Sequence, residues 1–98
     1  MEQGLRWFVR RANDSEILYH IKDIVIEGFD YTDPCNYIGN KEGYVDDIVY
    51  GSTITFINSY DQLSNLNQSS QREIYKFIIS KFYNLISKHY DMFVEVCE

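Results

Sequence analysis

The periodicity of apolar and polar residues is clearest in the last third of the chain, where it predicts one long helix. Ser70 and Glu73 have the spacing of a capping box, which satisfies backbone amides at a helix start. Over residues 74–91 the apolar side chains fall on one half of a helical wheel. They are Ile74, Tyr75, Ile78, Ile79, Phe82, Tyr83, Leu85, Ile86 and Tyr90, and His89 lies on the same side.

A second helix is predicted from Asn13 to about Glu27. Asn13 is a plausible cap, and Gly28 is a typical stop. The apolar residues between them recur with the spacing of one helical face: Ile17, Leu18, Ile21, Ile24 and Val25. Three consecutive β-branched residues leave open a strand over residues 22–27 after a shorter helix.

Three stretches have the character of β-strands. Residues 5–10 and 93–97 alternate in polarity, and residues 48–58 are rich in β-branched and aromatic types. Ser59 and Gln62 predict a short helical turn after the central strand. The chain therefore reads β-α-loop-β-short α-α-β. We expect a single domain over residues 1–98 with an α+β fold, in which two helices cover a three- or four-stranded sheet. The strand order stays open.

The net charge of −6 is concentrated in one quarter of the chain. Residues 23–47 hold seven carboxylates and one lysine, and the remaining residues sum to zero. Four helix- and strand-breaking residues occur in the same segment: Gly28, Pro34, Gly39 and Gly43. Residues 28–46 are therefore predicted to form a long acidic loop, and such loops in small domains are commonly functional.

This acidic loop also carries tyrosines, and the combination predicts a surface that docks onto a basic protein. Carboxylates steer a cationic partner, and tyrosines provide rigid contact area. The predicted partner-binding residues are Asp30, Tyr31, Asp33, Tyr37, Glu42, Tyr44, Asp46 and Asp47. The alternative is that the charge only keeps a small protein soluble.

In size and charge the chain resembles small acidic immunity proteins and inhibitors of bacteria and phages, although no motif is shared. The resemblance implies a non-enzymatic inhibitor or antitoxin that neutralises a nuclease toxin or another nucleic-acid-binding protein. The alternative function is a homo-oligomeric structural or assembly protein without inhibitory role. In that case Tyr83 and Tyr90, at one edge of the long helix's apolar face, would extend into a homodimer interface.

Catalysis, metal binding and direct nucleic-acid binding are not expected. Counting from Asp30, an EF-hand loop needs glycine sixth and glutamate twelfth, where the chain has Cys35 and Lys41. A nucleophilic Cys35 would need a histidine, and only His20 and His89 exist. We therefore predict no metal and no cofactor, and a small enzyme is the least favoured function. The acidic balance argues against binding nucleic acid directly.

The two cysteines and the start of the chain bear on location. Cys35 and Cys97 are too few to define a disulfide framework, and whether they meet is left open. The first residues lack the basic and apolar regions of a secretory signal, and no apolar run is long enough to span a membrane. We predict a cytoplasmic protein with free thiols and no membrane contact.

Overall fold

The computed structural model describes residues 4–97, and these residues form helices and no strand. Helix accounts for 81% of the structure. The elements in chain order are α1 (Leu5–Arg11), α2 (Ser15–Tyr31), the 3-10 turn η1 (Pro34–Tyr37), α3 (Lys41–Asn58), the 3-10 turn η2 (Asp61–Leu63) and α4 (Gln68–Val94).

The predicted α+β fold with a three- or four-stranded sheet is wrong, because every predicted strand is helical or a turn. Residues 5–10 lie in α1 and residues 48–58 in α3, while residues 93–97 finish α4 and the turn after it. The buried residues of α3 recur in pairs every four residues: Tyr44, Val45, Ile48, Val49, Ser52, Thr53, Phe56 and Ile57. Packing of this stripe outweighs the β-propensity of its valine, isoleucine and threonine residues.

The predicted acidic loop over residues 28–46 is also largely helical. Helix α2 continues to Tyr31, which confirms the predicted helix over residues 22–27 but not the predicted stop at Gly28. Helix α3 begins at Lys41, so only residues 32–40 connect the two helices, and they include η1. Most of the acidic residues are therefore held on helices.

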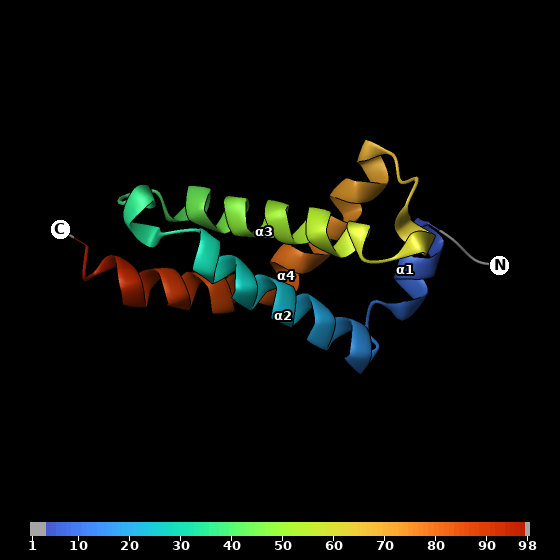
Figure 1. Cartoon of the computed structure of the whole chain (residues 1–98), viewed down its shortest axis with the longest axis horizontal. Helices are drawn as coiled ribbons and strands as arrows, with labels where there is room; N and C mark the ends of the chain where they lie inside the picture. The colour runs from blue at the N-terminus through green and yellow to red at the C-terminus, as the bar shows by residue number, and fades with distance from the viewer. Residues whose placement is uncertain (1–3, 98) are drawn as a thin grey trace.

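Three long helices form an elongated bundle in which α4 crosses behind α3 (Figure 1). The molecule measures 52 × 25 × 19 Å, and α3 packs against both α2 and α4. Helix α1 and η2 lie at one end, and η1 lies near the C-terminal end of the chain at the other (Figure 1). Aromatic and branched aliphatic side chains from all four helices form a continuous core.

Side-chain caps define the ends of the elements around η1. The Asp33 carboxylate accepts a bond from the amide of Cys35 at 2.9 Å and so caps η1. Asn40 caps α3 by accepting from the amide of Gly43 at 3.1 Å. Gly39, with φ of 75°, adopts the left-handed conformation that turns the chain between them. Individual side chains and one glycine therefore determine the path of the connection between α2 and α3.

A disulfide joins Cys35 in η1 to Cys97, just beyond α4, with 5.5 Å between the two Cα atoms. The prediction of free thiols is wrong. It failed because Cys97 was placed in a strand of unknown position, whereas the length of α4 carries it back to η1. The disulfide ties the end of the chain to the connection between α2 and α3.

Candidate protein-binding surface

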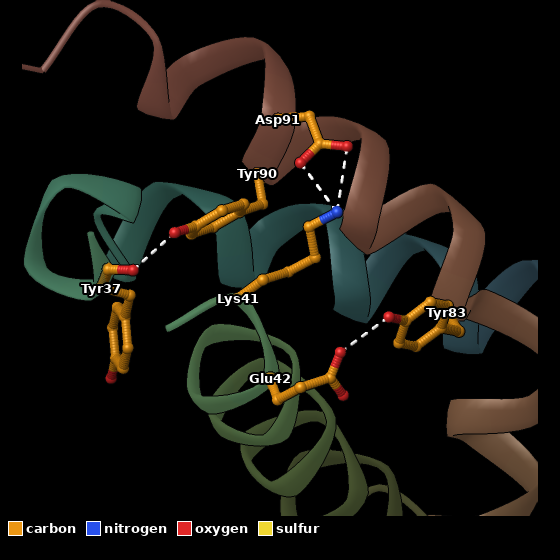
Figure 2. A network of polar contacts seen from close by, with 6 residues as sticks. All are labelled: Tyr37, Lys41, Glu42, Tyr83, Tyr90 and Asp91. Atoms are coloured by element: carbon orange, nitrogen blue, oxygen red, sulfur yellow. Dashed lines mark hydrogen bonds and ion pairs between the residues drawn. The ribbon is translucent and has the colours of Figure 1, made fainter. Parts of the chain in front are cut away.

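Helices α3 and α4 run antiparallel, and their shared edge pairs acids of one with tyrosines of the other. The Tyr83 hydroxyl donates to a Glu42 carboxylate oxygen at 2.8 Å (Figure 2). One turn further along α3, the carboxylate of Asp46 accepts from the Tyr75 hydroxyl at 2.5 Å. Two of the acids that were predicted to bind a partner are therefore engaged within the protein.

The same edge continues to the η1 end through an ion pair and a third tyrosine hydrogen bond. The Lys41 ammonium lies 2.9 Å from a carboxylate oxygen of Asp91 on α4 (Figure 2). The Tyr90 hydroxyl donates to the backbone carbonyl of Tyr37 at 2.5 Å. Tyr37 itself donates its hydroxyl to the carboxylate of Asp47. These contacts fasten η1 to both α3 and α4.

The carboxylates raise the pKa of the tyrosines that donate to them. For Tyr37 and Tyr83 the hydrogen bond, to Asp47 and Glu42 respectively, is the largest cause. For Tyr75 desolvation comes first and the bond to Asp46 second, and together they raise the pKa to about 12. A tyrosinate would lose the bond and repel the acid, so the neutral donor is the stable form.

Tyr44, predicted as a surface anchor, is buried in the core. Its side chain is 0% exposed, and its ring lies 5.7 Å from that of Tyr37 and 5.4 Å from that of Tyr90. Its hydroxyl has no hydrogen-bond partner among residues 4–97, and burial raises its pKa to about 12. Tyr44 is therefore a core residue and offers no area to a partner.

Three of the eight predicted residues remain exposed without a tyrosine partner: Asp30, Tyr31 and Asp33. Tyr31 is 88% exposed, the highest value among the exposed large hydrophobic residues of the described chain. Asp30 ends a series of carboxylates at successive turns of α2 that begins with Asp23 and Glu27. No hydrogen bond or ion pair joins Asp23, Glu27 or Asp30 to other residues of the described chain.

We call Asp23, Ile26, Glu27, Asp30 and Tyr31 the α2 acidic face. Ile26 is 44% exposed within it, so the face combines negative charge with apolar area. The sequence-based prediction omitted Asp23, Ile26 and Glu27, although the helical spacing of the acids was a signal that pointed to them.

Beside the α2 acidic face lies a groove of about 540 Å³ between the end of α2, η1 and the end of α4. Its lining is aromatic and apolar with two carboxylates: Phe29, Asp30, Tyr31, Asp33, Pro34, Cys35, His89, Phe93 and Val96. Phe93 and Val96 were not predicted as site residues, because they belong to the stretch assigned to a strand.

Cys35 is in a disulfide and has no thiol to act as a nucleophile. Between residues 4 and 97 no three His, Cys, Asp or Glu side chains are grouped so that they could hold a metal ion. Within that range, too, no helix has the length and apolar character needed to cross a membrane.

Comparison of the chain with known protein families, with curated proteins and with solved structures finds no match.

Proposed function

We propose that this protein is a non-enzymatic binding protein that covers a basic protein partner with its α2 acidic face. One observation carries the proposal. Asp23, Glu27 and Asp30 are exposed and unpaired within the described chain, and the 88% exposed ring of Tyr31 lies beside them. By contrast, the three acids of α3 accept hydrogen bonds from tyrosine hydroxyls within the chain.

The contrast between the two sets of acids supports this assignment. Glu42, Asp46 and Asp47 each accept a tyrosine hydroxyl, so their charge has a structural use. Within the described chain, no tyrosine hydroxyl donates to Asp23, Glu27 or Asp30. Unpaired carboxylates steer a cationic partner over long range, and an exposed tyrosine supplies contact area at low entropic cost.

The class of partner follows from charge. A surface of carboxylates can take the place of phosphates on a basic protein, so a nuclease toxin or another nucleic-acid-binding protein suits this face. The protein would then act as an inhibitor or immunity protein. The cytoplasmic location stays a prediction, and the disulfide argues against it because disulfides persist mainly in oxidising compartments.

Affinity capture from a lysate of the source cells, read by mass spectrometry, tests the proposal. A binding variant would carry Asp23→Asn, Glu27→Gln and Asp30→Asn. A control variant would carry Glu16→Gln, Asp61→Asn and Glu73→Gln, which removes the same charge from exposed positions outside the α2 acidic face. We expect one basic protein that the wild type and control retain and the binding variant loses. Equal capture by all three, or capture of nothing, would overturn the proposal.

The captured partner then allows a quantitative test. Tyr31→Ala should weaken binding by about 2–4 kcal/mol if the ring lies in the centre of the interface. Loss of a single rim acid such as Asp23 should mainly slow association and reduce its dependence on salt. An unchanged affinity in the Tyr31 variant would exclude this residue as an anchor.

The alternative of a homodimer through Tyr83 and Tyr90 gains no support from the geometry. Tyr90 is only 5% exposed, and both hydroxyls are bonded within the chain. Sedimentation of the wild type and of the binding variant separates the two functions. A dimer that persists in both would favour an assembly protein.

A further inference from the structure

The groove at the η1 end combines aromatic walls with carboxylates. Phe29 and His89 stack with ring centroids 3.8 Å apart, and Phe93 lies 4.6 Å from His89. Phe93 is 45% exposed, so part of this aromatic surface is open to solvent. Asp30 and Asp33 belong to the same lining, which contains no lysine or arginine.

We propose that this groove holds an arginine side chain of the basic partner, an inference that rests on the proposed function and names the group the protein recognises. The guanidinium is planar and weakly hydrated, so it stacks on aromatic rings while it bonds carboxylates through its edge. Phe29 and Phe93 supply the rings, and Asp30 and Asp33 supply the acceptors.

The carboxylates are suitably placed for this role. Asp33 is held in position by the bond from the Cys35 amide to one of its oxygens. Asp30 lies close enough to His89 for its charge to raise the pKa of the imidazole, although burial outweighs it and the net pKa is lowered. His89 is therefore neutral near pH 7 and does not compete with an incoming cation.

The same features disfavour other occupants. Two carboxylates repel a phosphate or a carboxylate group, and a purely apolar side chain would leave both negative charges without a cation to neutralise them. A lysine ammonium can pair with one acid but lacks the flat surface that stacks on Phe29 or Phe93. The volume of about 540 Å³ falls within the usual range of about 300–1,000 Å³ for binding clefts.

The disulfide completes one wall of the groove. Cys35 contributes to the lining directly, and Val96 is held there because its neighbour Cys97 is bonded to η1. Opening the disulfide would free Val96 from η1, so the oxidised protein is the form expected to bind arginine.

The test is a nuclear magnetic resonance titration of the oxidised, full-length protein with acetyl-Leu-Arg-Leu-amide. A matched peptide carries citrulline, which has nearly the same shape without the charge. We expect the arginine peptide to shift amide signals of residues 29–36 and 89–97, with an affinity about tenfold higher than that of the citrulline peptide. No shifts at millimolar arginine peptide, or equal binding of both peptides, would overturn the inference.

Three variants separate recognition in the groove from general attraction to negative charge. Phe93→Ala keeps the charge and should weaken the arginine peptide about fivefold, and Asp30→Asn should weaken it similarly. Asp23→Asn removes the same charge outside the groove and should leave the affinity within twofold. Equal effects of Asp23→Asn and Asp30→Asn with none from Phe93→Ala would show that charge alone attracts the peptide.

The two proposals can fail separately. A basic partner that is captured through the α2 acidic face, together with no preference for arginine over citrulline, would remove only the groove inference. A clear arginine preference without any basic protein captured would leave the groove and remove the proposed partner class.

Discussion

Phe29 of α2 and His89 of α4 lie face to face, with ring centroids 3.8 Å apart and an angle of 6° between the planes. Tyr44 of α3 is nearly parallel to the same imidazole at 6.4 Å. The three long helices thus meet at one histidine. Burial lowers the pKa of His89 from its usual 6.5, and the nearby charge of Asp30 only partly opposes this.

The lowered pKa of His89 predicts a protein that is less stable in mild acid. Below pH 6.5 the unfolded chain binds a proton at His89 before the folded protein does, so the free energy of unfolding falls with pH until the folded pKa is passed. Urea unfolding between pH 7.5 and 5 should show this loss. His89→Phe should reduce it, and an equal loss in the variant would contradict the assignment.

The buried hydroxyl of Tyr44 is predicted to cost stability. It has no hydrogen-bond partner among residues 4–97, and an unpaired buried polar group costs about 1–3 kcal/mol. Tyr44→Phe should therefore raise the free energy of unfolding by about 1 kcal/mol. Tyr90→Phe is the matched control, because it removes a hydroxyl that donates to the Tyr37 carbonyl and should lower stability by about 1 kcal/mol. Denaturant unfolding of both variants would show whether each substitution raises or lowers the free energy of unfolding.

The disulfide is predicted to provide a large part of the stability. It links residues 62 apart in sequence, and closing a loop of that length typically contributes about 2–4 kcal/mol. Unfolding of the wild type with and without dithiothreitol should differ by that amount, whereas a Cys35→Ser, Cys97→Ser variant should be indifferent to the reductant. Identical unfolding of the wild type in both conditions would mean that the bond contributes nothing.

The sequence predicted α2 and α4 but not α3, for a physical reason. Both predicted helices have polar faces that make the helical period visible, although α4 begins at Gln68 with Asn67 as its cap, before the predicted Ser70. In α3 the buried stripe includes Ser52 and Thr53, which hide the period among β-branched neighbours. Thr53 is accommodated because its hydroxyl donates to the Val49 carbonyl at 2.7 Å.

The acidic segment was recognised from the sequence, but the role of each residue in it was not. Whether Asp46 faces solvent or Tyr75 depends on the antiparallel contact of α3 with α4, which brings together residues 29 apart. The approach of Cys35 to Cys97 depends likewise on the helical path between them. The sequence shows where the acidic residues are concentrated. Only the packing of the helices shows which of them are bonded within the protein and which are free to contact a partner.

Replacing either of two glycines by alanine is expected to change the stability of the protein, in opposite directions. Gly51 lies inside α3, and a Cβ there would meet no atom within 4 Å, so Gly51→Ala should stabilise the protein by about 1 kcal/mol through helix propensity. Gly39 also has open space around it, but its φ of 75° strains any other residue, so Gly39→Ala should destabilise it. Thermal unfolding of the two variants compares them directly, and destabilisation by Gly51→Ala would contradict the helical assignment of α3.

The raised pKa values of the tyrosines predict that the protein loses stability at alkaline pH. The pKa is raised for Tyr37, Tyr44, Tyr60, Tyr75 and Tyr83, in two of them to about 12. Above pH 10 the unfolded chain releases these protons first, so it binds fewer protons than the folded protein and stability falls as pH rises from 10 to 12.

Titration of tyrosinate absorbance tests this in the native protein. A substantial fraction of the tyrosines should ionise only as the protein unfolds. Tyr75→Phe should reduce that fraction. Asp46→Asn removes the carboxylate that accepts the Tyr75 hydroxyl, so Tyr75 should ionise at a lower pH in that variant. If every tyrosine titrated near the free value of about 10, the bonds between α3 and α4 would not exist in solution. The acids assigned to that edge would then be available to a partner after all.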